Sequence, residues 1–255
     1  MGAAFAKGVV TSGSIKAADV TVADLDEKRL SRLAQDLGVN TTADSVFAAK
    51  SADIVLLAIK PGIVPVVLDG IRGALITSKL VISIAAGVCL EALESRVPEG
   101  VGVIRVMPNT PCQVGAGAIA FCAGKAVTRE QVEIAKGIFN AVGISYEVPE
   151  KLISAVTGLS GSGPAYVYVM IEALSDAGVR VGLPRDTATR LAAQTVYGAA
   201  KMVLDEGQHP AALKDQVTSP GGTTIAGIDA LEKAGFRSAL IEAVKAATKR
   251  SEELV

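Results

Sequence analysis

The sequence predicts an α/β protein in which a doubly wound, mostly parallel sheet is followed by an all-helical region. Up to residue 149, short β-branched runs alternate with stretches of helical spacing, which is typical of βαβ units. After Pro149 no strand-like run of any length recurs, and Ala-rich helical segments follow instead. Half of the 255 residues are hydrophobic and a fifth are charged, which excludes general disorder. We therefore expect two domains, residues 1–149 and residues 150–255.

The expected elements follow from periodicity and from helix-end residues. Strands are expected at residues 20–23, 54–59, 80–84, 101–106, 118–122 and 145–148, and helices at 27–37, 63–71, 90–97 and 129–141. Gly38 stands where a left-handed glycine ends a helix, and Thr128 with Gln131 has the spacing of a capping box.

The region after residue 149 is expected to be helical throughout. The predicted helices cover residues 165–177, 185–206, 210–217 and 224–253. The last of them carries an apolar stripe that includes Ile225, Ile228 and Leu231. Most of this stripe is expected in the core, and some of it is expected to pack against a second chain.

The beginning of the chain departs from the usual pattern of such sheets. A doubly wound sheet normally opens with a strand, the glycine pattern G-x-G-x-x-G and a helix, whereas this chain opens with Met1-Gly2 and the helix. The first strand is apparently missing, so its neighbours should carry unpaired backbone groups. We expect roughly ten further residues upstream of Met1, with that strand and the leading glycines.

Charge and cysteine content narrow the functional classes. Lys and Arg number 25 and Asp and Glu number 26, a formal charge of −1 that argues against nucleic-acid or membrane binding. No apolar run reaches the roughly 20 residues of a membrane span, and we expect no signal peptide, because Lys7 is followed by Gly and polar residues rather than by an apolar stretch. With one His and three cysteines that form no C-x-x-C, we expect no metal site and idle thiols in a reducing cytoplasm.

Asp24, at the end of the strand expected over 20–23, is a candidate cofactor residue. An acidic side chain there can accept hydrogen bonds from the adenosine ribose and repel a 2′-phosphate, which favours NADH. Lys28 and Arg29 lie one turn further on and could serve a 2′-phosphate, so NADPH stays open. The alternative is that Asp24 only forms a turn at the strand end.

Further candidates for cofactor binding follow the next three strands, where open α/β sheets bind ligands. These residues are Ala58, Lys60, Pro61, Ala85, Ala86, Gly87 and Asn109. Small residues let a cofactor approach the backbone, although they also occur where a helix packs closely. Pro108 and Pro111 stiffen the loop around Asn109, whose amide could reach the nicotinamide ribose or carboxamide, or could form an ordinary Asx-turn.

Two glycine-rich segments are candidates for substrate binding. Around Ser162 and Gly163, free N–H groups and hydroxyls could face a ligand, or the segment is a plain break between helices. At Gly222, Thr223 and Thr224, a Pro-Gly-Gly turn leads into a helix whose N–H groups suit a carboxylate. The alternative for this second segment is a solvent-exposed helix cap.

Taken together, these motifs resemble the pyrroline-5-carboxylate reductase family over essentially the whole chain. The most specific stretch is 213–232, around Thr-Ser-Pro-Gly-Gly-Thr-Thr, and residues 157–165, 105–111 and Lys60-Pro61 match as well. The resemblance implies a Rossmann-type domain followed by an all-helical C-terminal dimerisation domain, in homodimers that commonly assemble into decamers. Gly2 is the one fingerprint glycine that carries over.

The resemblance also implies a reaction. Hydride passes from C4 of NADPH or NADH to C5 of the cyclic imine 1-pyrroline-5-carboxylate, which yields L-proline. The N–H groups of Gly222, Thr223 and Thr224 would hold the substrate carboxylate, with the catalytic Thr224 hydroxyl nearest the imine nitrogen. Ser162 and Gly163 would close the substrate pocket.

Two other functions stay open on the sequence alone. A dehydrogenase of the β-hydroxyacid type would use a helical lysine as acid and base, and no lysine after residue 160 has the expected glycine-flanked helical context. A non-catalytic ligand-binding or dimerisation protein is the other alternative, and titration with NADH and NADPH separates it from the enzymes.

Overall fold

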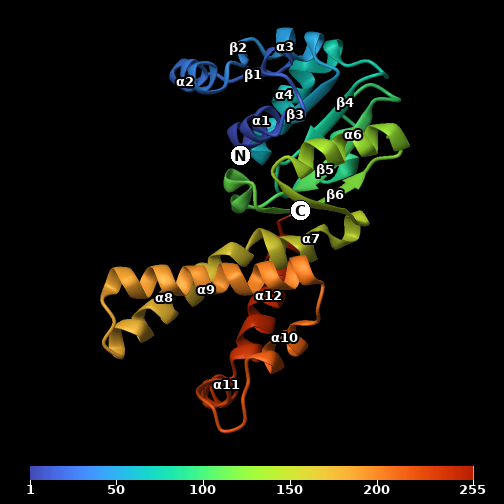
Figure 1. The fold of residues 1–255 in the computed structure, drawn as a ribbon. Helices are drawn as coiled ribbons and strands as arrows, with labels where there is room; N and C mark the ends of the chain where they lie inside the picture. Colours follow the sequence, from blue (N-terminus) through green and yellow to red (C-terminus); the bar gives the residue numbers. More distant parts are fainter. Residues whose placement is uncertain (255) are drawn as a thin grey trace. The chain divides into compact units, whose positions relative to one another are not determined.

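The computed structural model describes residues 1–254, which form two compact units. The first unit comprises Met1–Ser162 together with the C-terminal residues from Ala246 onward, and the second comprises Gly163–Lys245 (Figure 1). Residues 150–162 therefore belong with the sheet, and the contacts place the end of this unit after the predicted boundary at residue 149. The reason is burial, because Ile153 is 2% exposed and packs in the same cluster as Leu57, Val81 and Val103 of the sheet.

All of the expected strands occur in the first unit. Its elements are α1 (Gly2–Thr11), β1 (Thr21–Ala23), α2 (Glu27–Leu37), β2 (Asn40–Thr42), α3 (Ser45–Ser51), β3 (Ile54–Leu57), α4 (Val64–Ile71), β4 (Leu80–Ser83), α5 (Leu90–Glu94), β5 (Gly102–Met107), β6 (Gly117–Ala123), α6 (Arg129–Asn140), β7 (Gly143–Glu147) and α7 (Ile153–Val156). The sequence analysis missed β2 and α3. Strand β2 holds only three polar residues, too few for a period to show.

The sheet is divided into two parts. Strands β3-β4-β5-β6-β7 form one sheet, parallel except for the antiparallel pair β5 and β6, while β1 and β2 form a separate parallel pair. Among residues 1–254, β1 pairs only with β2 and β3 only with β4. Strands β1 and β3, the expected neighbours of the missing strand, therefore lie in separate sheets. The expected upstream strand stays a prediction.

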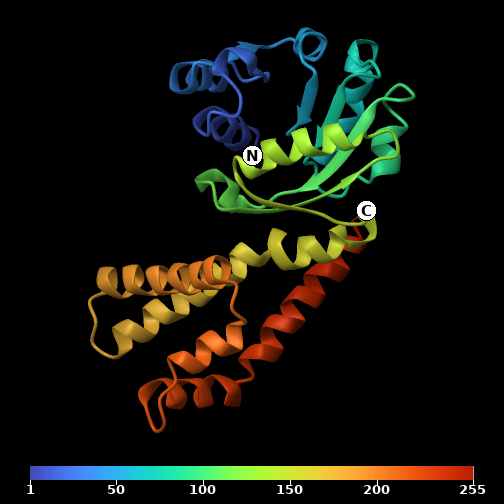
Figure 2. The same cartoon turned by 45° about the vertical axis from the view of Figure 1, so that its right-hand side comes forward.

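Helices cover both faces of the five-stranded sheet (Figures 1 and 2). On one face, Phe5 of α1 and Phe139 of α6 pack with Phe121 of β6. The centroid of the Phe139 ring lies 6.5 Å from that of Phe5 and 5.2 Å from that of Phe121. On the other face, α3, α4, α5 and α7 pack against the alternate strand residues, such as Val81. This three-layer arrangement confirms the doubly wound, Rossmann-like class.

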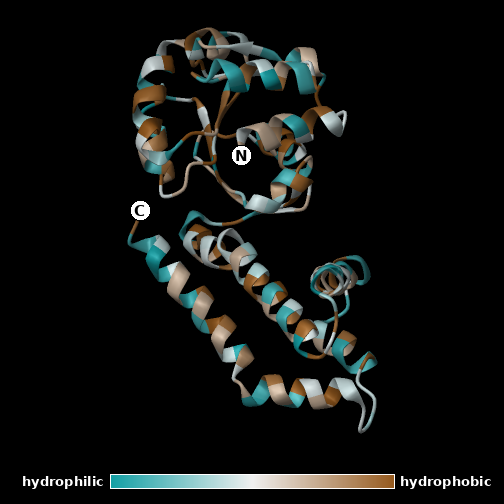
Figure 3. Cartoon of the chain, turned by 90° about the vertical axis from the view of Figure 1, so that its left-hand side faces the viewer, coloured by the Kyte–Doolittle hydropathy of each residue, from teal (hydrophilic) through white to brown (hydrophobic). Residues whose placement is uncertain are grey.

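The second unit is helical, as predicted. It holds α8 (Gly163–Arg180), α9 (Arg185–Glu206), α10 (Pro210–Gln216), α11 (Thr223–Lys233) and most of α12 (Phe236–Glu252). Hydrophobic and hydrophilic bands alternate along these helices (Figure 3). Helices α8 and α9 lie side by side, and the hydroxyls of Ser175 and Thr189 are 2.7 Å apart. None of the helices within residues 1–254 combines the length and hydropathy needed to cross a membrane.

The prediction of one helix over residues 224–253 is wrong. The chain forms α11 and α12 instead, because Gly235 has a φ of +72° and this left-handed backbone ends the first helix. The apolar stripe is also less buried within the chain than expected, since Ile225 and Leu231 are 41% and 50% exposed. Its packing against a second chain stays a prediction.

Candidate functional site

The carboxyl ends of β3, β4 and β5 lie at one edge of the sheet, because these strands are adjacent and parallel. The three groups of cofactor candidates that follow them are therefore brought to the same edge. Ala58, Lys60 and Pro61 follow β3; Ala85, Ala86 and Gly87 follow β4; and Asn109 follows β5. Open α/β sheets bind their ligands outside this edge.

The first turn of α1 lies against the end of β3. A Cβ atom added to Gly2 would be 2.9 Å from the Cβ of Ala58, closer than side chains pack, so only glycine permits this approach. No side chain caps the N-terminus of α1. The first N–H groups of the helix, which suit an anion, are therefore presented beside Ala58.

Asp24 lies just beyond the end of β1 in a network of hydrogen bonds. Its Oδ1 accepts from the backbone N–H of Asp26 at 3.1 Å, and its Oδ2 accepts from Nη1 of Arg29 at 3.0 Å. The Asp26 N–H, with the Arg29 guanidinium, lowers the pKa of the Asp24 carboxyl below its ordinary 3.8. Asp24 is thus a carboxylate at neutral pH, and Arg29, one of the two cations that the sequence offered to a 2′-phosphate, is paired with it.

The loop after β4 presents backbone rather than side chains. Ala85 is buried and its N–H donates to Oγ of Ser83 at 3.4 Å, while Ala86 is exposed. Gly87 has a φ of +74°, and a Cβ there would be 3.2 Å from the carbonyl oxygen of Leu254. The left-handed backbone favours glycine at this position, and a Cβ would also require the Leu254 carbonyl to shift by a few tenths of an ångström. Ser83, the last residue of β4, was not among the predicted site residues, and the hydrogen bond from Ala85 connects it with this loop.

Asn109 is buried and its amide is bonded inward. Its Nδ2 donates to the carbonyl oxygen of Ser160 at 3.1 Å, and its Oδ1 accepts from the backbone N–H of Ala118 at 3.0 Å. The side chain is therefore more than the Asx-turn offered as its alternative, because it connects the loop after β5 with two distant segments.

The expected helix break near residue 160 is a π-turn. Residues Thr157–Gly161 form one turn of π-helix between α7 and α8, closed by the hydrogen bond from the Ser162 N–H to the Thr157 carbonyl at 2.8 Å. A Cβ on Gly161 would lie 2.7 Å from Cε of Met107, so glycine allows the end of β5 to pack on the turn. Such π-turns are frequent at functional sites. Met107 and Ser160 were not among the sequence candidates.

Gly163 and the Gly222–Thr224 segment belong to the second unit. Helix α11 begins at Thr223 with Gly222 as its N-cap, and no side chain accepts a hydrogen bond from its first N–H groups. Gly221 has a φ of +67°, and the Gly222 N–H donates to the Ser219 carbonyl at 3.1 Å. Thr224 is half-buried and Thr223 exposed. Such a helix start can bind a carboxylate.

An ion pair between a buried arginine and a half-buried glutamate near the site was missed by the sequence analysis. Nη1 of Arg105, a β5 residue 6% exposed, lies 2.9 Å from Oε1 of Glu150, which also accepts from the backbone N–H of Leu90 at 2.6 Å. The bonds connect β5, the start of α5 and the segment after β7. No local pattern could reveal a pair that is 45 residues apart.

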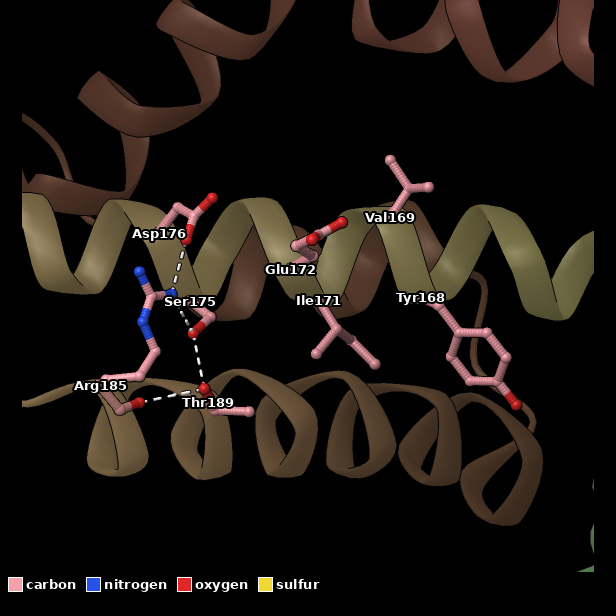
Figure 4. A pocket seen from close by; sticks show the side chains of 8 residues that line it. All are labelled: Tyr168, Val169, Ile171, Glu172, Ser175, Asp176, Arg185 and Thr189. Atoms are coloured by element: carbon pink, nitrogen blue, oxygen red, sulfur yellow. Dashed lines mark hydrogen bonds and ion pairs between the residues drawn. The ribbon is translucent and has the colours of Figure 1, made fainter.

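Two cavities contain none of the predicted site residues. One, of about 580 Å³, lies between α8 and α9, where Arg185 donates to Ser175 and to Asp176 (Figure 4). The other, of about 450 Å³, is lined by residues that include Leu90 and Glu150. Within residues 1–254, no three or more His, Cys, Asp or Glu side chains are placed to bind a metal ion.

The cysteines are free, and two of them are buried. Burial raises the pKa of the Cys122 thiol to about 12, with the nearby Glu150 carboxylate as a smaller cause, and burial also raises the pKa of Cys112. Both groups are therefore protonated thiols at neutral pH.

Comparisons with known proteins agree with the geometry. A family model described as pyrroline-5-carboxylate reductase dimerisation matches residues 150–254, and one described as NADP oxidoreductase coenzyme F420-dependent matches residues 1–87. The pyrroline-5-carboxylate reductase of Methanosarcina acetivorans is 46% identical over 254 residues, which cover 100% of this chain and 94% of the relative. That of a Synechocystis strain is 50% identical and covers 92% of this chain and 88% of the relative.

Solved structures show the same likeness. A pyrroline-5-carboxylate reductase from Coxiella burnetii is 37% identical, with a TM-score of 0.94, and covers 98% of this chain and 93% of its own. A pyrroline carboxylate reductase of Plasmodium falciparum, solved with NADP bound, is also 37% identical, with a TM-score of 0.86 and coverage of 100% and 94%.

Proposed function

The chain belongs to the pyrroline-5-carboxylate reductase family, and on that premise we propose which of its own residues carry out the reaction. It is an NAD(P)H-dependent oxidoreductase that reduces the C=N bond of 1-pyrroline-5-carboxylate to give L-proline, the last step of proline biosynthesis. The single observation that carries this function is the 46% identity that extends over the whole chain.

The dinucleotide is proposed to bind at the carboxyl ends of β3, β4 and β5. The residues assigned to it are Gly2, Asp24, Ala58, Lys60, Pro61, Ala85, Ala86, Gly87 and Asn109. Two observations support binding of a dinucleotide here. Gly2 approaches Ala58 so closely that a Cβ on residue 2 would fill the space between them, which we call the Gly2 cradle, and the first N–H groups of α1 have no side-chain cap. When bound, the nicotinamide supplies the hydride; the protein supplies placement and electrostatics.

Asp24 is proposed to make NADH at least competitive with NADPH. Its carboxylate can accept hydrogen bonds from ribose hydroxyls, and its charge repels a 2′-phosphate. We expect Asp24→Ser to shift the ratio of kcat/KM values towards NADPH, because the repulsion disappears and Arg29 loses the nearer of its two carboxylate partners. A strong NADPH preference that Asp24→Ser leaves unaltered would remove Asp24 from this role.

The substrate carboxylate is proposed to bind at the start of α11. The assigned N–H groups are those of Gly222, Thr223 and Thr224. That of Gly222 already donates to the Ser219 carbonyl at 3.1 Å, so the carboxylate falls to the N–H groups of Thr223 and Thr224, in the first turn of a helix without a side-chain cap. The Thr224 hydroxyl is assigned to the imine nitrogen as the catalytic residue, and Ser162 and Gly163 to the closing of the pocket. No strong acid or base is needed, because an imine is readily protonated.

Substitution at Thr224 tests this assignment. Thr224→Ala should lower the hydride-transfer rate about tenfold or more and leave the Kd of NAD(P)H unchanged, since one hydrogen bond to a charged group is lost. Thr224→Ser, which keeps the hydroxyl, should restore most of the rate. Thr11→Ala removes an exposed hydroxyl that bonds its own helix and is the matched control. Unchanged turnover in Thr224→Ala would exclude the hydroxyl from the reaction.

Assembly and location are proposed from the same premise. The match of residues 150–254 to a dimerisation model supports an oligomer built through this region. We propose a homodimer that assembles further into a decamer, acts in the cytoplasm and binds neither nucleic acid nor a membrane. The near-neutral charge and the free cysteines support this. Light scattering coupled to size exclusion measures the mass, and a stable monomer would contradict the proposal.

The decisive assay follows NAD(P)H absorbance with 1-pyrroline-5-carboxylate as substrate. This chain is compared with a version extended upstream by a short apolar strand and the leading glycines. We expect both versions to oxidise NAD(P)H only when 1-pyrroline-5-carboxylate is present, and the extended version to bind the dinucleotide more tightly. Binding of neither dinucleotide to either folded version would refute the assigned cofactor site.

A further inference from the structure

A proline leaves one carbonyl of the π-turn without its usual partner. In a continuing helix, the carbonyl of Ser160 would accept a hydrogen bond from the N–H four residues later, but that residue is Pro164, which has no N–H. Nδ2 of Asn109 donates to the Ser160 carbonyl at 3.1 Å. The Asn109 amide thus replaces the donor that the proline lacks.

The orientation of the Asn109 amide is determined by its surroundings. Ala118 offers an N–H and Ser160 offers a carbonyl, so the oxygen must face Ala118 and the nitrogen must face Ser160. Pro108 and Pro111 restrict the backbone on both sides, and the Asn109 carbonyl accepts from the Cys112 N–H at 3.2 Å. The residue as a whole is only 8% exposed. It is therefore held in one position before any ligand binds.

The π-turn is held both by its own side chains and by contacts with the end of β5 and the loop that follows it. Within the turn, the hydroxyls of Thr157 and Ser160 bond carbonyls of the preceding turn, at 2.8 Å and 3.2 Å. From outside, Asn109 bonds Ser160 and the methyl of Met107 packs on Gly161. The turn ends at Ser162, one of the residues proposed to close the substrate pocket.

We propose that Asn109 is a positioning residue for the substrate side of the site: through the Ser160 carbonyl it holds the π-turn, and with it Ser162, in the geometry that the pyrroline ring requires. The proposal rests on the proposed function. Asn109 follows β5 at the sheet edge assigned to the cofactor, and by this proposal it also affects binding of the substrate.

Asn109→Leu tests the proposal, because leucine has nearly the same shape and no donor. We expect the KM for 1-pyrroline-5-carboxylate to rise about tenfold, equivalent to ~1.4 kcal/mol. Both polar atoms of the Asn109 amide are bonded within the protein, so the contact assigned to Asn109 with the dinucleotide is one of its backbone, and the Kd for NAD(P)H should change less than about twofold. Asn140→Leu, at the exposed end of α6, is the control. If Asn109→Leu does not fold, Asn109→Ser serves, because its shorter side chain cannot reach Ser160.

A second substitution should restore the lost donor. Pro164→Ala returns an N–H four residues after Ser160, so Asn109→Leu combined with Pro164→Ala should recover most of the pyrroline KM. A role confined to general stability would give no such rescue. The proposal is overturned if the double variant is no better than Asn109→Leu. It is also overturned if the loss in Asn109→Leu lies in the NAD(P)H Kd, or if no kinetic constant changes.

One measurement does not depend on activity. Exchange of the Ser162 amide hydrogen, which donates to Thr157 across the π-turn, should be faster in Asn109→Leu than in wild type and should slow again in the double variant. A wild-type protein that reduces no imine would refute the proposed function while this exchange still reports on the π-turn. Unchanged exchange in Asn109→Leu would refute the positioning role itself.

Discussion

Two helical glycines of the first unit should respond to alanine in opposite directions. Gly8 lies in α1 and is buried, and a Cβ there would be 2.8 Å from the carbonyl oxygen of Ala141 and closer still to Cγ1 of Val142. Gly137 lies in α6 with nothing within 4 Å of the position of its Cβ. Glycine costs a helix about 1 kcal/mol relative to alanine in both places. The difference between the two sites is therefore the space around them.

The structure sets the sizes of the two effects. Gly137→Ala should raise the free energy of unfolding by about 1 kcal/mol, since only the helix propensity changes. In Gly8→Ala the same gain is opposed by overpacking of about 1–3 kcal/mol, which leaves a net loss of ~0–2 kcal/mol. At about 2–4 °C per kcal/mol, Gly137→Ala melts slightly above wild type and Gly8→Ala at or below it.

Thermal unfolding followed by circular dichroism, at one protein concentration for all variants, measures this difference. A second readout connects it with function: α1 must move away from α6 to admit the methyl group, which shifts Gly2 relative to Ala58. Gly8→Ala should therefore weaken NADH and NADPH binding in a fluorescence titration, while Gly137→Ala should not. If Gly8→Ala raises Tm as much as Gly137→Ala does, α1 does not pack closely on α6, and the argument for the Gly2 cradle fails.

Three further predictions concern titratable groups. A thiol reagent at pH 8 should modify Cys89 in the folded protein and Cys122 only after unfolding, since burial raises the Cys122 pKa to about 12; rapid loss of both thiols would contradict this. Glu150→Ala should lower the free energy of unfolding in urea by about 2–4 kcal/mol, because it leaves the buried Arg105 guanidinium unpaired; a loss below about 0.5 kcal/mol would mean that water replaces the carboxylate. The pKa of the Asp24 carboxyl is lowered on folding, so the carboxylate stabilises the folded protein fully above its ordinary pKa of 3.8, and this stabilisation is lost as pH falls through the lower folded value. The difference in the free energy of unfolding between wild type and Asp24→Asn should therefore be constant from about pH 5 to 7 and narrow only in stronger acid.

The fold was largely predictable because its determinants are local. The capping box at Thr128 has both of its reciprocal hydrogen bonds with Gln131, and Gly38 has the left-handed backbone expected at a helix end. The break between α11 and α12 was missed although Gly235 stands there. A single glycine inside a helical pattern is tolerated often enough that its φ cannot be inferred from sequence.

The site was predictable only in part, for the same reason. Residues that follow buried strands, such as Ala58, Ala85 and Asn109, come to one edge of the sheet because parallel strands end together. The residues that these side chains bond could not be predicted in the same way. Asn109 and Ser160 are 51 residues apart, and no periodicity relates positions at that distance. The role of Gly2 likewise depends on Ala58, which only the packed structure places beside it.

One signal for the Asn109 contact was nevertheless present in the chain. A proline in the first turn of a helix removes an N–H, and when the helix is preceded by another helical turn, the carbonyl four residues back loses its donor. A buried carbonyl without a donor is costly, so such a proline predicts a side-chain donor or a water molecule at that place. The sequence Ser160-Gly161-Ser162-Gly163-Pro164 meets this condition. Counting backbone donors and acceptors can therefore show that a partner is required, while the identity of that partner, Asn109, follows only from the fold.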